Sequence, residues 1–280
     1  PPPPGPGNSP RKPPLGRSAK TMCRALILRK AGMLHVNFVL FFCCMLMPRE
    51  ARGSDNSDHP SLFAYEEVYE RLYAGQGYHS DLRLYHGGNI GNFLDNPIWR
   101  KELGPILDAG CSHGAGVNML WNAGFQASGV DVSRTAVKLA IQARKGRGDH
   151  HKLCAEQPCF RQGSLTQIPW ANGTFDAVIS SDVMEHITPT DVPYVIREFR
   201  RIGARWLFLK IANKPEVNKE PVHFLSQQNL TILNSVTTLH STVKPLDWWK
   251  ARFAKEGYHH LLGDMSFSVY HCDYKDGIPR

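Results

Sequence analysis

The chain contains 280 residues, 42% of them hydrophobic, and seven cysteines, which excludes a wholly disordered protein and a small scaffold built on disulfides. The formal net charge of +8 comes from one region: positions 1–52 hold nine Lys or Arg and a single acid, Glu50, whereas the rest of the chain holds equal numbers of bases and acids. Because the body is neutral, it lacks the basic surface that follows nucleic-acid phosphates, and we expect no nucleic-acid partner.

The N-terminal region divides into three segments before the main domain at 61–280. Residues 1–30 are basic, and eight of the first fourteen are proline, which predicts an extended, disordered tail. Residues 31–47 contain no Asp, Glu, Lys or Arg, so they predict a hydrophobic helix. Residues 48–60 are a polar linker.

The hydrophobic segment 31–47 has three interpretations. Its length lies at the lower edge of what a membrane anchor needs. The basic stretch before it, and the small residues Ala51 and Gly53 after it, also fit a secretory signal. The third interpretation is an ordinary buried helix. Bases before the segment favour a cytosolic N-terminus, so we expect a membrane-anchored or secretory protein, or a cytoplasmic one if the segment is not used.

Other features of the body bear on whether the protein enters the secretory pathway. Residues 172–174 and 229–231 are N-glycosylation triplets, Asn-Gly-Thr and Asn-Leu-Thr. In an oxidising compartment Cys154 and Cys159 could form a local disulfide, and the alternative is two unpaired thiols. The spacing of these cysteines from the neighbouring histidines matches no standard zinc site, so we expect no metal site.

The main domain begins with a helical pattern and a loop. After residue 60, Tyr65, Tyr69 and Tyr73 recur at i, i+4 and i+8, which predicts the packing face of a helix. A loop rich in glycine and aromatic residues follows at Tyr78–Phe93.

From residue 104 onward, predicted strands alternate with predicted helices. The strands are expected at 105–109, 125–130, 159–163, 175–180, 206–211 and 266–271. One helix is expected after the Gly-rich turn, with Val117, Leu120 and Trp121 on one face, and another after a Ser133 cap, carrying Val137, Ala140 and Ile141. Two more are expected at 190–201 and at 248–256, the last between an Asp247 cap and a Gly257 stop. This alternation predicts an α/β fold with a doubly wound parallel sheet.

The first strand leads directly into a glycine-rich turn. Gly110, Gly114 and Gly116 follow it and precede a helix, so backbone and helix N-terminus can approach a ligand closely. Asp108 lies just before the first glycine, and Asp131 lies at the end of the next strand. A carboxylate there can accept both hydroxyls of a ribose. The pattern predicts an adenine-containing cofactor at the carboxyl ends of the strands.

Two cofactor classes share this geometry. The spacing G-x-x-x-G-x-G differs from the G-x-G-x-x-G of the usual dinucleotide fingerprint. Short-chain dehydrogenases use similar glycine spacing but need a Tyr-x-x-x-Lys pair, which the chain lacks. An acid at Asp108 suits a cofactor with a cationic amino-acid end, and a nicotinamide dinucleotide has none. A nicotinamide-dependent oxidoreductase is therefore the weaker alternative.

The sequence resembles class I S-adenosylmethionine (SAM)-dependent methyltransferases, particularly the type-11 branch that includes the quinone-biosynthesis enzymes. Three segments carry the resemblance in the expected order: LDAGCSHGAG, GVDVS and FDAVISSDVMEHI. The resemblance covers about residues 62–273. It implies SAM as the cofactor and a Rossmann-like, seven-stranded, mostly parallel sheet, here preceded by the hydrophobic helix. An alternative from another class is a methyltransferase-like protein that has no activity and binds a partner.

The resemblance assigns roles to individual residues. The cofactor-binding residues it implies are Asp108, Gly110, Gly114, Gly116, Asp131, Val132, Ser164, Leu165, Ser181 and Asp182. Among them Asp108 and Gly110 face the methionine end, Asp131 holds the ribose and Val132 flanks the adenine. Ser164 is a departure, because the family usually has an acid at that place. Glu185 and His186 match the family's Glu-His pair.

The methyl acceptor cannot be identified from the sequence. We expect its pocket to come from Tyr78–Phe93 and from 213–247, and we expect a small molecule, a lipid or a glycan. If the acceptor arrives protonated, a general base is needed, and the candidates are His186, then His223, then His240. No oligomeric state is predicted.

Overall fold

The computed structural model describes residues 60–75, 89–95, 103–144, 158–217, 219–228 and 236–273, all within the unit His59–Arg280. Residues 1–30, 31–47 and 48–59 lie outside these ranges, so the predictions of a tail, a hydrophobic helix and a linker are not tested by the structure. Among the described helices, none is both long and apolar enough for a membrane span.

Seven strands form one sheet. They are β1 (Ile106–Ala109), β2 (Ala127–Asp131), β3 (Phe160–Gln162), β4 (Ala177–Ser181), β5 (Trp206–Lys210), β6 (His259–Gly263) and β7 (Ser268–His271), in the order β3-β2-β1-β4-β5-β7-β6. β1 to β5 pair in parallel, whereas β7 is antiparallel to both β5 and β6. This confirms the predicted mostly parallel sheet. The strand order reverses between β1 and β4, where open α/β sheets bind ligands.

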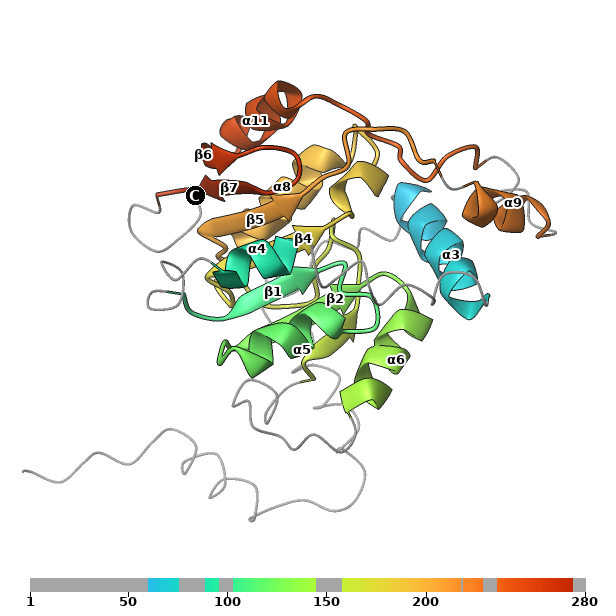
Figure 1. The fold of residues 1–280 in the computed structure, drawn as a ribbon, viewed down its shortest axis with the longest axis horizontal. Helices are drawn as coiled ribbons and strands as arrows, with labels where there is room; N and C mark the ends of the chain where they lie inside the picture. Colours follow the sequence, from blue (N-terminus) through green and yellow to red (C-terminus); the bar gives the residue numbers. More distant parts are fainter. Residues whose placement is uncertain are drawn as a thin grey trace, which may run out of the picture. The chain divides into compact units, whose positions relative to one another are not determined.

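Helices cover both faces of the sheet (Figure 1). They are α3 (Pro60–Ala74), α4 (Asn89–Asp95), α5 (Ala115–Asn122), α6 (Arg134–Arg144), α8 (Val192–Arg201), α9 (Glu220–Ser226) and α11 (Leu246–Lys255), with a 3-10 turn, η4 (Met184–His186), after β4. α4, α5 and α6 share a core with Ile106 and Ala177, and α8 and α11 share another with Leu107 and Leu207. Successive strand residues therefore face opposite layers.

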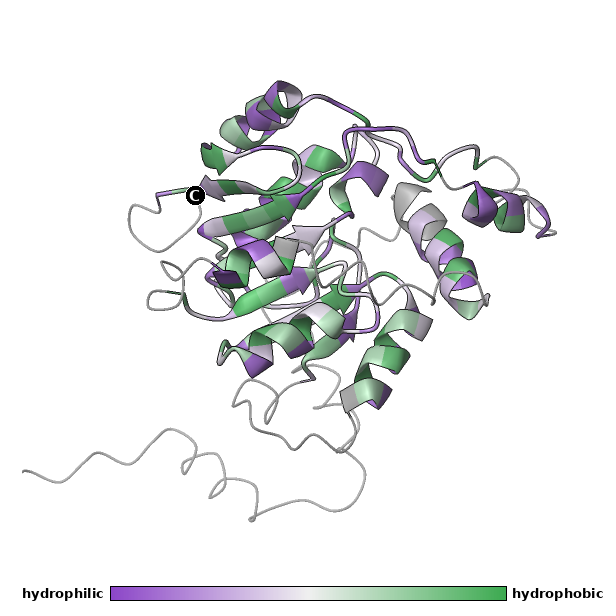
Figure 2. Cartoon of the chain, viewed as in Figure 1, coloured by the Kyte–Doolittle hydropathy of each residue, from purple (hydrophilic) through white to green (hydrophobic). Residues whose placement is uncertain are grey.

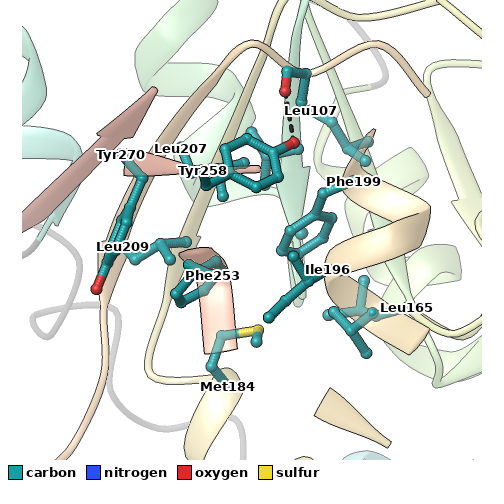
Figure 3. Close-up of a cluster of buried hydrophobic side chains, with 14 of the residues drawn as sticks. Leu107, Leu165, Met184, Ile196, Phe199, Leu207, Leu209, Phe253, Tyr258 and Tyr270 are labelled. Atoms are coloured by element: carbon teal, nitrogen blue, oxygen red, sulfur yellow. Dashed lines mark hydrogen bonds between the residues drawn. The ribbon is translucent and has the colours of Figure 1, made fainter. Parts of the chain in front are cut away.

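Apolar strands account for this layering. Figure 2 shows β1 and β5 as mainly hydrophobic, and each is buried between helices. The larger core joins β1, β4 and β5 to α8 and α11, and includes Phe199 and Phe253 (Figure 3). Within it the buried hydroxyl of Tyr258 donates to the carbonyl of Ala204 at 2.6 Å, so its polar atom is satisfied.

The structure adds detail to one local prediction and corrects two others. The helix expected to carry Val137, Ala140 and Ile141 is present, with the first two residues buried and Ile141 44% exposed. Asp247 does not cap α11, because the helix begins two residues earlier than predicted, at Leu246, and its N-cap is Pro245. The loop expected at Tyr78–Phe93 ends earlier, because Phe93 belongs to α4 and packs against the core with its ring 4.7 Å from that of Phe208.

Strand β6 was missed by the sequence analysis. It is an edge strand whose residues are mostly exposed and pair only with β7, so its sequence shows no alternation between buried and exposed sides. The other strands begin and end within two residues of their predicted limits. Cys159 is disulfide-bonded, but Cys154, its expected partner, lies outside the described residues, so this pairing stays a prediction.

Candidate active site

The turn after β1 requires glycine at two positions. Gly110 has φ 82° and Gly114 has φ 80°, in the left-handed region that disfavours residues with a Cβ atom. A Cβ at Gly110 would also lie 2.4 Å from Cγ2 of Val183. Gly114 directly precedes α5, so the turn delivers the bare N-terminus of that helix to the carboxyl edge of the sheet.

Asp108 carries an unsatisfied carboxylate oxygen next to this turn. The residue is 4% exposed, and within the described part of the chain its Oδ2 has no hydrogen-bond partner. Burial, together with the charge of Asp131, raises the pKa of Asp108 to about 7. A Cβ at Gly116 would lie 2.5 Å from the same oxygen, so glycine keeps the approach to it open. The arrangement suits a cationic donor from a ligand.

Asp131 is the second buried carboxylate, at the end of β2 beside β1. Its Oδ2 accepts the backbone N–H of Ser112 and its Oδ1 accepts that of Ser133, both at 2.9 Å. Burial raises its pKa to about 6 against the opposing effect of these N–H groups, and the charge of Glu70 adds to the rise. Each oxygen accepts one bond and retains a lone pair, so the fixed carboxylate can accept two more donors.

Helix α3 is bonded to the start of α6 through Glu70. The Glu70 carboxylate accepts bonds from Ser133 Oγ at 2.8 Å, Thr135 N at 2.9 Å and Thr135 Oγ1 at 2.7 Å. Burial opposes the charged form, but the hydrogen bonds from Thr135 and Ser133 outweigh it and lower the pKa of Glu70. An ionised side chain thus caps α6 from another helix.

The same helix reaches the segment that follows β4. The hydroxyl of Tyr65 accepts the N–H of Thr188 and donates to Oδ2 of Asp191 at 3.1 Å, and burial raises its pKa to about 12. The Tyr69 ring meets the His186 ring edge-on, with centroids 5.8 Å apart. Helix α3 therefore contacts the chain beyond both β2 and β4, on the edge where the two aspartates lie.

A second polar cluster follows β4. Glu185 and His186 belong to η4, and His240 approaches from the segment before α11, with the two imidazole centroids 4.9 Å apart. The backbone N–H of Thr242 donates to the carbonyl of Glu185 at 2.8 Å, which fixes the two segments together. Nδ1 of His186 lies 3.0 Å from the carbonyl oxygen of Leu239.

Burial controls the ionisation of this cluster. It raises the pKa of Glu185 to about 7, and the neighbouring charge of Asp182 acts in the same direction. It lowers the pKa of His186 to about 4, with a further contribution from His240, so the imidazole is neutral at pH 7. Because a carbonyl only accepts, the proton of His186 lies on Nδ1 and its Nε2 can accept.

Comparison with known proteins identifies the central part of the chain. Residues 107–205 match the model of a family described as a methyltransferase domain. This segment is a methyltransferase domain. It contains the glycine turn, both aspartates, Glu185 and His186.

Individual relatives cover the domain to different extents. Norajmaline N-methyltransferase from Rauvolfia serpentina is 32% identical over 114 residues, which are 40% of this chain and 36% of that protein's length. The solved structure titled "Conversion of a Disulfide Bond into a Thioacetal Group during Echinomycin Biosynthesis" has a TM-score of 0.52 at 17% identity and covers 74% of this chain and 91% of its own. The structure of magnesium protoporphyrin IX methyltransferase from Synechocystis PCC 6803 has a TM-score of 0.49 at 19% identity. The match covers 74% of this chain and 94% of that protein's chain.

The methyltransferase domain brings most of the expected cofactor residues to one edge. Asp108 and the glycines lie beside Asp131, because β1 and β2 are adjacent. Ser181 ends β4, and the exposed Asp182 after it has φ 55° and pairs with Lys210 at 2.6 Å. The role of each in cofactor binding stays a prediction.

The other expected contacts have partners within the protein. Val132 is half-buried, and its carbonyl accepts a bond from Gln162 Nε2 at 3.3 Å. Ser164 Oγ bonds to Thr166 Oγ1 at 2.8 Å, while the Leu165 side chain packs in the larger core (Figure 3). Their places beside an adenine stay predictions.

Of the three candidate bases, the fold brings two together. His186 and His240 are adjacent, whereas His223 lies on α9, where its Nε2 contacts Gln227. Residues 78–88 of the expected acceptor pocket lie outside the described residues. The sequence analysis gave Tyr65 only a packing role and did not single out Glu70, because their hydrogen-bond partners lie far along the chain and no local motif links them.

Proposed function

We propose that the protein transfers a methyl group from SAM to a small-molecule acceptor. One observation carries the proposal: neighbouring strands β1 and β2 present two buried carboxylates, with a glycine turn between them at the start of α5. The matched methyltransferase domain supports the reaction class. The named small-molecule relative, an N-methyltransferase, supports the acceptor class. A lipid or glycan acceptor stays a prediction.

The residues present fit this cofactor. The unpartnered Oδ2 of Asp108 suits the ammonium group of a bound amino acid, and Gly116 leaves space beside that oxygen. Asp131 is held by two backbone N–H groups and retains the lone pairs that two ribose hydroxyls require. Binding of a cation favours the charged form of Asp108 and lowers its pKa.

When bound, SAM supplies an activated methyl group on a sulfonium. The chain's contribution is then mainly alignment, which can lower a barrier by on the order of 7–11 kcal/mol. In this proposal Asp108 and Asp131 hold two ends of the cofactor. His186 is neutral at pH 7, and its Nε2 can take a proton from an acceptor that arrives protonated.

Calorimetric titration of the purified protein with SAM tests the proposal. We expect heat of binding in the wild type and a loss of affinity of roughly 100-fold or more in Asp131→Ala, because charged hydrogen bonds contribute about 1.5–3 kcal/mol each. Asp247→Ala is the matched control, since that carboxylate is 92% exposed on α11. Unchanged affinity in Asp131→Ala would reject the assignment. Incubation of a metabolite extract with labelled SAM would then identify the acceptor, and binding without any transfer would favour the inactive binding protein.

We also propose that the domain lies in an oxidising compartment of the secretory pathway, reached through residues 31–47. The disulfide at Cys159 supports this location. Asn172 is exposed in a turn, so its triplet is accessible for glycosylation. Treatment of the protein from its native cells with an N-glycosidase should reduce its apparent mass, and Asn172→Gln should remove part of that shift. An unchanged mass in both would reject glycosylation at this site.

A further inference from the structure

We propose that Glu185, His186 and His240 form a binding site for a divalent transition-metal ion. One ligand atom from each residue lies within 4.8 Å of the other two. Ligands at about 2.1 Å from a tetrahedral ion lie ~3.4 Å apart, so binding requires the ligand atoms to approach one another by at most about 1.4 Å. This departs from the sequence-based expectation of no metal site.

The hydrogen bonds of both histidines prepare them as ligands. Nδ1 of His186 lies 3.0 Å from the carbonyl of Leu239, and Nδ1 of His240 lies 2.9 Å from the carbonyl of Lys214. Each carbonyl accepts a hydrogen bond from Nδ1–H, so the ring proton stays on Nδ1 and Nε2 of each ring keeps its lone pair. Metal-binding histidines usually have this arrangement, with the second nitrogen donating to a carbonyl or carboxylate.

Glu185 supplies the independent observation. Its side chain is 0% exposed, and within the described ranges neither carboxylate oxygen makes a hydrogen bond of ordinary geometry. Lys210, whose charge acts to lower the pKa of Glu185, is already paired with Asp182 at 2.6 Å. A buried carboxylate without partners is unfavourable unless it is protonated, paired or bound to a metal. An ion held with the two imidazoles satisfies it.

The ligand set indicates the type of metal. Two imidazoles and one carboxylate suit Zn²⁺, Fe²⁺, Mn²⁺ or Co²⁺ better than Ca²⁺ or Mg²⁺, which prefer oxygen ligands alone. Three protein ligands also leave a coordination position open, as in catalytic zinc sites.

The role of this open position rests on the proposed function. An acceptor hydroxyl that binds the ion there releases its proton to water, because coordination makes it more acidic. The resulting oxygen anion forms a bond to the SAM methyl carbon as the carbon–sulfur bond breaks, which yields the methyl ether and S-adenosylhomocysteine. In this reaction the Nε2 lone pair of His186 binds the metal, so the ion replaces the imidazole in activating the acceptor.

Cobalt binding tests the site directly. The full-length protein is dialysed against a chelator and titrated with Co²⁺, with visible absorption and elemental analysis as readouts. We expect one equivalent with the absorption bands of a nitrogen- and oxygen-ligated ion, and more than ~100-fold weaker binding in His240→Ala and Glu185→Gln. His223→Ala is the matched control, because this histidine lies on α9 with Gln227 as its partner. Equal Co²⁺ binding in the wild type and His240→Ala, or no binding to either, would overturn the proposal.

A SAM titration of the same samples separates this proposal from the proposed function. Retained SAM binding without Co²⁺ uptake rejects the metal site alone. Co²⁺ uptake without SAM binding rejects the methyltransferase assignment alone. Retained SAM affinity in His240→Ala and Glu185→Gln also shows that these variants fold, since Asp108 and Asp131 come from β1 and β2.

Discussion

The two polar clusters at the carboxyl edge of the sheet are assembled in different ways. Asp108 and Asp131 come from adjacent parallel strands, and one glycine turn and one short helix separate them in the chain. Glu185 and His186 meet His240 from a segment much later in the chain, beyond β5 and α9, which is held by the bond between Thr242 N and the Glu185 carbonyl. The first cluster depends on local sequence and the second on tertiary packing.

The two clusters also differ in the ligand they favour. Burial raises the pKa of both Asp108 and Glu185 to about 7. The neighbour of Asp108 is another carboxylate, so the pair is suited to a cationic organic group and to sugar hydroxyls. The neighbours of Glu185 include two imidazoles, so that cluster is suited to a metal ion. Similar burial of a carboxylate thus supports different chemistry, depending on what surrounds it.

The prediction with the largest expected effect concerns the glycine turn of the first cluster, which depends on local sequence. Gly110→Ala should reduce the free energy of unfolding by about 2–4 kcal/mol, because it combines left-handed backbone strain with a clash against Val183. Gly124→Ala is the matched control: its φ is 87°, but no atom lies within 4 Å of the added Cβ, so only the strain of about 1–2 kcal/mol remains. Urea denaturation measures both. Equal losses would show that close packing at Gly110 contributes nothing.

A second prediction concerns how pH affects the first cluster. The pKa of Asp108 is raised from 3.8 to about 7 in the fold. Its protonated form therefore stabilises the cofactor-free protein at low pH, and this contribution is lost as the pH rises through 7. Since the ionised form binds a cation, SAM affinity should rise about tenfold between pH 6 and pH 8 through Asp108 alone.

Asp108→Asn is the control for that pH dependence. With only Asp131 left to titrate near pH 6, the variant should bind SAM more weakly and gain only about twofold between pH 6 and pH 8. Calorimetry in buffers matched for ionic strength measures both proteins. A tenfold rise that persists in Asp108→Asn would assign the titration to a different group.

The first cluster could be predicted from sequence because it depends on neighbouring segments. Apolar runs revealed β1 and β2, and their adjacency placed Asp108 beside Asp131. The pairing of His186 with His240 could not be predicted, because the intervening segment follows no period and its path is set by packing. Strand β6 was missed for a related reason: an exposed edge strand needs no apolar pattern, and its pairing with β7 determines its structure.

Helix α3 contacts residues near both polar clusters. The prediction with the smallest expected effect tests the hydrogen bonds of its Glu70 to the start of α6, beside the first cluster. Glu70→Gln should reduce the free energy of unfolding by about 1 kcal/mol, because the amide keeps one accepting oxygen but loses the charge that caps α6. Glu67→Gln is the matched control on the same helix. Its exposed pair with Arg71 at 2.8 Å contributes only about 0.3–0.5 kcal/mol.

The same variant should also change cofactor binding, in a direction opposite to its effect on stability. The charge of Glu70 contributes to the raised pKa of Asp131, so its removal should lower that pKa. SAM binding by Glu70→Gln should then lose less affinity than the wild type when the pH falls from 7 to 5.5, although the protein unfolds at a lower urea concentration. If stability and low-pH affinity fall together, Glu70 acts only by holding α3 in place, and its charge has no influence on Asp131.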